Sequence, residues 1–320
     1  MSKKTKLKLW VCICVAAVII VLGVLLICKI TEPQENIFFL EYESEYEKED
    51  TIIYRYNATN KTVTEVGKVK GELQDCVINS NETCITGMVY GEVAEIVRYD
   101  LLTGAVETLD AARKIDTLTD NRAGWGNILI FDGGNKIFVG FIDEYDVKKW
   151  LIYNLKNDQY DIIEREDGVI SYLTIQDDKL WYIADSGYFD YGNLYQYDLE
   201  KKEKTKIMEH LSRDAVIMPD TGLVAYTEGT YRKEILMYNI MTQNTSYLVE
   251  GGWNTYFGQL LWTNSRWSDN GNEFFYVKSF PGLFHEATIQ LMTYDVITHR
   301  SRCIYKVKMT TNEFRYVMKR

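Results

Sequence analysis

The sequence predicts an all-β protein: a six-bladed β-propeller with four antiparallel strands per blade, preceded by one N-terminal transmembrane helix. Three observations predict this. A tyrosine followed by Asp or Asn recurs six times before a turn, hairpin signals precede five of these copies, and twenty consecutive residues near the N-terminus carry no charge. The chain has 320 residues, of which 46% are hydrophobic and 26% charged, as is usual for a globular protein.

The N-terminal apolar run, residues 9–28, has the length of a membrane-spanning helix. At ~1.5 Å per residue, a helix of this length crosses a hydrocarbon core of ~30 Å. Four lysines precede the run and only Lys29 follows it closely. The positive-inside rule therefore places the N-terminus in the cytosol and the remainder outside. We expect a cytosolic basic tail at 1–8, a transmembrane helix at 9–29, a linker at 30–36 and an extracytoplasmic propeller at 37–320.

A cleaved signal peptide is the competing interpretation of the same run. Its apolar core is usually about 7–15 residues long and is followed by small residues at the cleavage site. Here the run ends in Leu26, Ile27 and Cys28, with no small residue at the exit. The pattern favours an uncleaved anchor, and hence a single-pass protein of the cell membrane.

The charge balance of the predicted extracytoplasmic part excludes one class of partner. Residues 1–29 contain five lysines and no acidic residue, so residues 30–320 carry 31 basic and 46 acidic residues, a net charge of -15. Nucleic-acid binding relies on basic side chains that neutralise phosphates. We therefore expect no nucleic-acid partner.

The six tyrosines of the repeated pattern are 43, 54, 44, 41 and 56 residues apart. Asp and Asn suit the start of a turn because their side chains accept hydrogen bonds from the backbone just ahead. A short strand-like run follows each copy. The tyrosines are Tyr56, Tyr99, Tyr153, Tyr197, Tyr238 and Tyr294.

A hairpin signal precedes five of the six copies. An apolar run, a tight polar turn and a second strand occur at 128–140, 173–185, 216–228 and 265–277, and more weakly at 76–88. The unit is therefore strand, tight turn, strand, longer loop, strand, Tyr-Asx turn, strand, which is a propeller blade. The first copy lacks its leading strand, and residues 312–318 form a spare one. We expect this C-terminal strand to complete the first blade and close the ring.

The repeat resembles that of TolB-type, WD-like bacterial propellers. The segment WSDNGNEFFY at 267–276 is similar to their Trp-Ser-Pro-Asp-Gly turn and following strand, and Pro219, Asp220 and Gly222 form a partial copy. The region outside the anchor also resembles membrane-anchored propellers of Gram-positive bacteria. The Trp-Asp dipeptide of WD repeats and the Tyr-Trp-Thr-Asp motif of lipoprotein-receptor propellers are absent. The resemblance implies architecture and no particular activity.

No catalytic motif accompanies the repeats. The phosphate-binding loop, the dinucleotide glycine fingerprint, the His-Glu-x-x-His pair and the Gly-x-Ser-x-Gly elbow are all absent. We assign no catalytic residue and expect no cofactor and no metal site. Of the three histidines, only His285 falls in a loop on the face that carries most propeller ligand sites, and a lone histidine is a weak catalytic candidate.

Long loops between the second and third strands of the blades give the best functional indication. These loops are expected at 43–50, 142–147, 185–193, 228–233 and 279–287, and they are rich in aromatic residues. Exposed aromatic rings suit recognition of a protein, peptide or glycan; the alternative is that each ring packs under its own loop. The candidate binding residues are Tyr46, Tyr145, Tyr188, Phe189, Tyr191, Tyr231, Phe280, Phe284 and His285.

The leading hypothesis is a membrane-anchored, extracytoplasmic propeller that acts as a binding or scaffold module for a protein, peptide or glycan. One alternative is an envelope enzyme, a hydrolase or lyase, with its site in the central pocket. Another is an accessory subunit of an envelope complex.

Cys76 and Cys84 lie symmetrically about Ser80, the expected turn of a hairpin. Opposite positions in a non-hydrogen-bonded cross-strand pair are close enough for a disulfide, and such a bond persists outside the cell. The pattern predicts either a Cys76–Cys84 disulfide or two packed, reduced thiols.

Overall fold

The structure is a computed structural model. It describes residues 36–42, 50–57, 59–90, 93–165, 168–188, 191–212, 215–227, 234–249, 266–268, 271–281, 287–309, 313–316 and 318–319. The chain divides into two compact units, residues 1–35 and 36–320, and every described residue belongs to the second. The predicted transmembrane helix thus lies outside the described residues. Within them, no helix is long and apolar enough to cross a membrane.

The first blade is built from strands at both ends of this unit's sequence. Its order is β24-β1-β2-β3, and its strands are β24 (Glu313–Tyr316), β1 (Asn36–Tyr42), β2 (Asp50–Asn57) and β3 (Thr62–Lys70). Strand β24 pairs antiparallel with β1, with Tyr316 opposite Phe39 and Glu313 opposite Tyr42. The predicted closure by the C-terminal strand is therefore confirmed.

Each of the other five blades contains four consecutive antiparallel strands. The second has β4 (Glu72–Ile78), β5 (Cys84–Tyr90), β6 (Glu95–Asp100) and β7 (Val106–Leu109), and the third β8 (Ala123–Phe131), β9 (Lys136–Ile142), β10 (Lys148–Asn154) and β11 (Tyr160–Glu164). The fourth has β12 (Val169–Gln176), β13 (Lys179–Tyr188), β14 (Tyr191–Asp198) and β15 (Glu203–Ser212). The fifth has β16 (Val216–Met218), β17 (Leu223–Thr227), β18 (Ile235–Asn239) and β19 (Asn244–Val249), and the sixth β20 (Arg266–Trp267), β21 (Glu273–Pro281), β22 (Ala287–Asp295) and β23 (Arg300–Met309).

Two elements were not predicted. Helix α2 (Ala111–Leu118) joins the second blade to the third and packs Ile115 into the core between them. Strand β25 (Met318–Lys319) follows β24 and pairs parallel with β4, so the second sheet has five strands. The C-terminal segment thus contacts two blades in succession.

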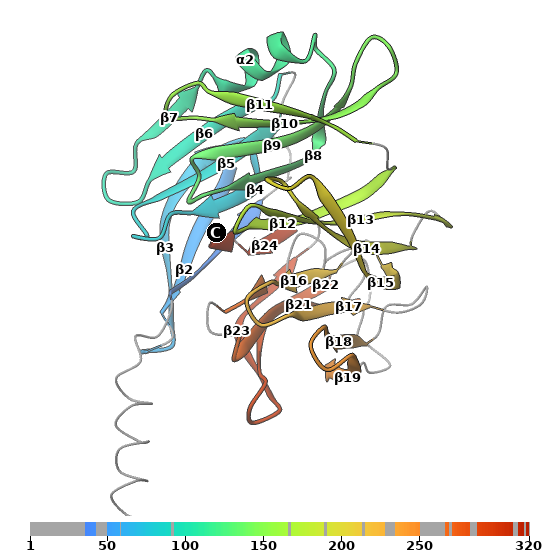
Figure 1. The fold of residues 1–320 in the computed structure, drawn as a ribbon. Coiled ribbons are helices and arrows are strands. Elements are labelled where there is room, and N and C mark those ends of the chain that lie inside the picture. The colour runs from blue at the N-terminus through green and yellow to red at the C-terminus, as the bar shows by residue number, and fades with distance from the viewer. Residues whose placement is uncertain are drawn as a thin grey trace, which may run out of the picture. The chain divides into compact units, whose positions relative to one another are not determined.

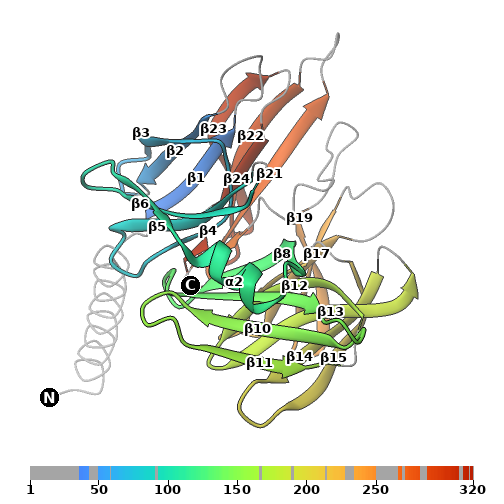
Figure 2. The ribbon, with the colours of Figure 1, turned by 90° about the horizontal axis from the view of Figure 1, so that it is seen from above.

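The hydrophobic core lies between the blades. Six buried clusters of described residues each join two neighbouring sheets, including the first to the last. In the closing cluster, Phe39 of β1 packs with Phe275 of β21 and Leu291 of β22. Figures 1 and 2 both show the blue N-terminal strands near the red C-terminal ones. The sheets therefore form the predicted all-β, six-bladed ring.

The repeated turn forms in all six blades as predicted. The Asp or Asn after each tyrosine accepts at least one hydrogen bond from a backbone N–H two or three residues ahead, as Asp295 Oδ1 does from Ile297 at 2.9 Å and Thr298 at 2.8 Å. The others are Asn57, Asp100, Asn154, Asp198 and Asn239. Each tyrosine lies near the end of the third strand of its blade.

Candidate functional site

The five predicted aromatic loops connect the second and third strands of five blades, namely β1–β2, β9–β10, β13–β14, β17–β18 and β21–β22. Because the blades repeat around one ring, these connections emerge at the same edge of their sheets, which we call the loop face. The connections from the outer strand of one blade to the inner strand of the next, such as β11–β12, reach the same edge.

Few of the predicted binding residues have described side chains. Tyr46, Phe189, Tyr231, Phe284 and His285 lie outside the described residues. Tyr188 and Phe280 fall in β13 and β21, where loops were expected, and their side chains are not described. Tyr191 begins β14, opposite Tyr188, and is half-buried. The strands of the fourth blade therefore extend further into the segment predicted as a loop.

Tyr145 stands at the tip of a well-supported turn between β9 and β10. Its side chain is 77% exposed. Asp143 Oδ1 accepts hydrogen bonds from the N–H groups of Tyr145 and Val147, both at 2.9 Å, and its other carboxylate oxygen lies 2.7 Å from Lys149 Nζ. Together with the turn N–H groups, this lysine holds the pKa of Asp143 below its usual range. The turn therefore presents one exposed aromatic ring on a fixed backbone.

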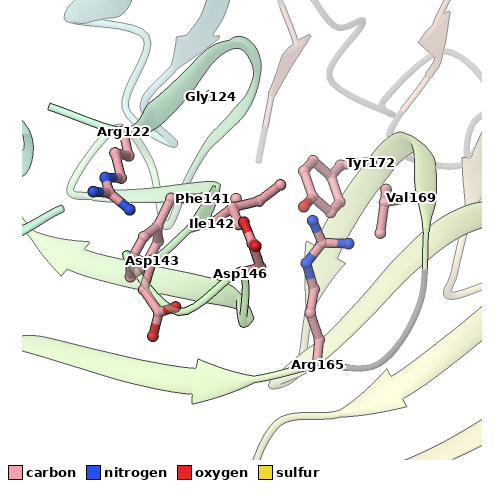
Figure 3. A pocket seen from close by; sticks show the side chains of 10 residues that line it. Arg122, Gly124, Phe141, Ile142, Asp143, Asp146, Arg165, Val169 and Tyr172 are labelled. Carbon is pink, nitrogen blue, oxygen red and sulfur yellow. The ribbon is translucent and has the colours of Figure 1, made fainter. Parts of the chain in front are cut away.

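A pocket of about 520 Å³ lies beside this turn, between the third and fourth blades. The β9–β10 turn contributes two aspartates, and the segments around β8, β11 and β12 supply two arginines and a tyrosine, as Figure 3 shows. The lining residues are Arg122, Gly124, Gly140, Phe141, Ile142, Asp143, Asp146, Arg165, Val169 and Tyr172. Since Ile142, Asp143 and Asp146 lie at the β9–β10 connection, the pocket belongs to the loop face.

Tyr172 is held firmly at the wall of the pocket. Its hydroxyl accepts a hydrogen bond from Trp150 Nε1 at 3.1 Å, and its ring meets Phe138 edge-on with centroids 4.9 Å apart. Gly140 makes this position possible, because a Cβ there would collide with the Tyr172 hydroxyl. The pocket wall thus depends on a glycine in β9 and an aromatic cluster from two blades.

Arg165 brings a positive charge to the pocket. Its backbone N–H donates to Lys148 O at 2.9 Å, and its guanidinium lies 5.9 Å from the centre of the Trp150 ring. Figure 3 shows this guanidinium close to the hydroxyl end of Tyr172. Burial raises the pKa of Tyr172, and the positive charge of Arg165 opposes that rise.

Arg122 brings a second guanidinium to the pocket. It pairs with Asp120 at 3.7 Å, and the side chain of Asp120 is 80% exposed. An ion pair so open to solvent contributes little free energy. Arg122 is therefore held only loosely by its neighbour.

Sequence reasoning did not identify Arg122, Arg165 or Tyr172. It followed the aromatic loops within blades, whereas these residues lie in or beside the connections between blades. The available signal was an arginine on each side of the third blade, directly before β8 and directly after β11.

In the structure Cys76 and Cys84 are free thiols, the second of the two alternatives that the sequence left open. Cys76 and Cys84 are not joined, and they are not opposite each other, because the register pairs Thr86 with Val77 and shifts irregularly between Gln74 and Val77. Asp75, at a φ of 50°, lies in that irregular stretch. Cys76 Sγ instead contacts Gln74 O at 3.3 Å. The register next to the turn, with Ile78 opposite Ile85, centres the hairpin at residues 81–82 and not at Ser80. Cys84 therefore lies beside Asn79, whose N–H donates to Cys84 O at 3.1 Å.

Among the described residues, no group of three or more His, Cys, Asp or Glu side chains is arranged to hold a metal ion. The pocket is lined by charged, aromatic and aliphatic side chains.

Comparison with known proteins identifies the fold. No family model matches the chain, and no curated protein matches it in sequence. TolB from Acinetobacter baumannii is similar in structure, with a TM-score of 0.60 at 13% identity over 89% of this chain and 67% of that one. A putative TolB from Agrobacterium tumefaciens gives 0.58 at 9% identity over 88% of this chain and 99% of that one. A puromycin-hydrolysing peptidase of Mycobacterium tuberculosis gives 0.50 at 13% identity, over 84% of this chain and 44% of that chain.

The chain thus has a TolB-like β-propeller fold, as the Trp-Ser turn of the sixth blade led us to expect. At these identities the likeness concerns the fold alone, and a propeller fold hosts many functions.

Proposed function

We propose that this protein is a single-pass membrane protein whose extracytoplasmic propeller binds a protein, peptide or glycan through its loop face. The observation that carries the proposal is the exposed Tyr145 on its fixed turn beside a pocket of about 520 Å³. Pockets of about 300–1,000 Å³ with a few convergent polar groups are typical of ligand sites. Rigid aromatic residues bury a large area at low cost in conformational entropy.

The membrane location in this proposal rests on the sequence. The uncharged run at 9–28, with lysines before it and few after it, supports an N-terminus in the cytosol and a propeller outside the membrane. The net charge of -15 in residues 30–320 supports a partner other than nucleic acid.

A photo-crosslinking experiment tests the loop face. A photoreactive phenylalanine analogue replaces Tyr145 in the full-length chain, in its native cells, and covalent adducts are identified by mass spectrometry and glycan staining. Tyr247 is the matched control, because it is also a tyrosine and is 60% exposed, on the outer strand β19 of another blade. We expect a discrete adduct from position 145 and none from position 247.

Two results would contradict the loop-face proposal. One is equal crosslinking from both positions, which would indicate random collision. The other is a discrete adduct at position 247 alone, which would place the binding surface on the outer edge of the ring.

A further inference from the structure

We propose that the propeller lies against the membrane with the face opposite the loop face, and that three apolar side chains of this face enter the lipid headgroup region. The proposal rests on the membrane anchor of the proposed function and adds which surface of the propeller meets the bilayer. We call this surface the turn face, because its rim is formed by the turns between the third and fourth strands of the blades, residues 57–61, 100–105, 154–159, 198–202, 239–243 and 295–299. The three apolar side chains are those of Leu102, Met241 and Ile297.

The chain enters the propeller at the turn face. The strands of a blade run antiparallel, so the turns between third and fourth strands lie at the edge opposite the loop face. Strand β1 begins at this edge, because Asn36 is paired with Asn57, the first residue of the turn in the first blade. The predicted helix ends at residue 29, and the chain from there to Asn36 spans at most about 25 Å, since an extended chain advances ~3.6 Å per residue. A membrane-spanning helix therefore holds this edge of the first blade close to the bilayer.

The three apolar side chains project from turns that are fixed to the propeller. The Asx side chain of each turn accepts backbone N–H bonds, as Asp295 does from Ile297 at 2.9 Å. The residue after the Asx packs against a buried cluster, and these packed residues are Leu101, Ile240 and Val296. The apolar residues that follow them are 63–83% exposed. Each turn therefore offers an apolar group to its surroundings without having to rearrange.

The exposed apolar residues are grouped around the blade that the chain enters. They lie on the second, fifth and sixth blades, which together with the first blade are consecutive around the ring. The same turn position is polar and exposed in the other blades, as Thr59 in the first, Lys156 in the third and Glu200 in the fourth. Single exposed apolar residues are usual on a protein surface. Three at one equivalent position, all on the side of the membrane attachment, are typical of a surface that contacts lipid.

The charges of the turn face indicate that apolar contact, and not electrostatic attraction, drives this association. Apart from the Asx residues, the turns of the second, fifth and sixth blades contain no Asp, Glu, Lys or Arg, whereas those of the third and fourth contain both acidic and basic residues. The hairpins between first and second strands reach the same edge, and with them the turn face carries more acidic than basic residues. An anionic bilayer repels such a surface, in contrast to a polybasic one.

Quenching of fluorescence by lipid tests the proposal in the full-length chain, reconstituted into phosphatidylcholine vesicles. An environment-sensitive fluorescent amino acid replaces one turn residue at a time, and the lipids carry a nitroxide near the headgroup end of the acyl chain. We expect a blue-shifted emission and quenching of about twofold or more at positions 102, 241 and 297, because these side chains enter the interface. Lys156 and Glu200 are the matched control positions, in the equivalent turns of the far blades, and little quenching is expected there.

A double variant tests whether the apolar side chains cause the contact. The fluorescent residue now replaces Thr59, and Leu102→Ser with Ile297→Ser removes the apolar side chains of the two neighbouring blades. We expect quenching at position 59 to fall by about half or more, because the apolar contact is lost. Val93→Ser with Ile162→Ser is the control and should leave the quenching unchanged, because these exposed residues lie away from the turns.

Salt separates apolar contact from electrostatic attraction. When phosphatidylglycerol replaces part of the phosphatidylcholine, we expect quenching at position 297 to rise with the salt concentration, because salt screens the repulsion between the acidic face and the anionic lipid. A decrease with salt would overturn the proposal, because it would show that charged groups hold the propeller to the lipid.

Equal quenching at positions 102 and 156, or none at either, would also overturn the proposal. So would a blue shift at position 297 that the lipid nitroxides do not quench, because the turn would then contact protein, such as a second copy of the chain. A chain that does not float with the vesicles would contradict the membrane anchor and this proposal together.

The crosslink at position 145 separates these failures from failure of the proposed partner site. If the turns stay unquenched while the adduct at position 145 forms, the loop face stands and the proposed role of the turn face is wrong. If the turns are quenched but no adduct forms, the turn face stands and the proposed partner face is wrong.

Discussion

At the scale of single residues, the Asx turn is the unit that the chain repeats. Asp198 accepts N–H bonds from Glu200 at 3.2 Å and Lys201 at 2.8 Å. We predict that Asp198→Ala lowers the free energy of unfolding, because both N–H bonds are lost, and that Asp198→Asn lowers it less at pH 7, because Asn keeps the acceptor but not the charge. Urea unfolding followed by tryptophan fluorescence measures both.

The same residue predicts a pH dependence. Its backbone bond to Lys201 holds the pKa of Asp198 below the ordinary value. A lowered carboxyl pKa stabilises the folded state above the unfolded pKa of about 3.9, and that contribution is lost as the pH falls through the folded pKa. The stability difference between wild type and Asp198→Asn should therefore shrink below pH 4, and a difference that grows there would contradict this assignment.

The fifth residue of each turn, four positions after the Asx, has a positive φ. Only the second blade uses glycine there, Gly104, whereas Lys202 has a φ of 58°. A residue with a Cβ costs about 1–2 kcal/mol in the left-handed conformation. Glycine avoids this cost, but it loses about 0.5–1 kcal/mol more backbone entropy on folding. We predict that Lys202→Gly raises the free energy of unfolding by about 0.5 kcal/mol.

Asp158 is the contrasting position for the glycine prediction. It has a similar φ of 57°, but its carboxylate accepts bonds from the Tyr153 hydroxyl at 2.6 Å and Lys114 Nζ at 2.7 Å. Asp158→Gly should therefore lower stability in the same urea assay. If Lys202→Gly and Asp158→Gly change the free energy of unfolding in the same direction, our explanation of these positions by backbone strain and side-chain contacts is wrong.

The Tyr-Asx turns could be predicted from the sequence, because their hydrogen bonds are local and need no distant partner. It did not predict the contacts of Tyr172, which depend on Trp150 from the neighbouring blade. Nor did it predict that Asp143 would be engaged by Lys149, since that requires the β9–β10 register. The fold thus follows from local patterns, whereas the pocket follows from how blades meet.

At the scale of elements, the C-terminal strand determines whether the first blade is complete. Strand β24 covers the inner edge of β1 over four paired residues, and β25 adds a two-residue pairing with β4. We predict that deleting residues 313–320 costs at least about 3 kcal/mol, since several backbone bonds of about 0.5–1.5 kcal/mol each are lost. It also exposes a strand edge that promotes aggregation.

Deletion of residues 317–320 is the control for this prediction, because it removes β25 and leaves β24. We expect it to have a clearly smaller effect on the thermal midpoint and on soluble yield. Equal losses from the two deletions would mean that the parallel pairing of β25, not closure by β24, holds the ends together.

Helix α2 explains one irregularity of the repeat. The interval of 54 residues between Tyr99 and Tyr153 exceeds the neighbouring 43 and 44, and the helix lies within it. Its position is fixed from β8, where Trp125 Nε1 donates to Asp116 at 2.8 Å. The helix was not predicted, because its formation depends on burying Ile115 between two blades, which no local pattern reveals.

At the scale of the whole molecule, the buried apolar side chains of the described residues form six clusters that lie between blades. Each blade is buried against two neighbours, and Phe39 and Phe275 complete the last contact. Repeats that contact only their neighbours need closure or capping to cover their end faces. The four-residue strand β24 therefore stabilises the whole ring, because it completes the first blade.

The proposed membrane topology can be tested with a thiol that the chain already carries. Cys303, on the outer strand β23, is exposed. If the propeller lies outside the cell, a membrane-impermeant maleimide should label this protein in intact cells as fully as in lysed ones. Cys303→Ser should remove most of that label, because Cys76 is buried and Cys84 only partly exposed. Partial desolvation by neighbouring atoms raises the pKa of the Cys303 thiol, and the thiolate is the reactive form. Labelling should therefore accelerate from pH 7 to pH 8.5. Labelling that requires lysis would place the propeller in the cytosol and contradict the proposed topology.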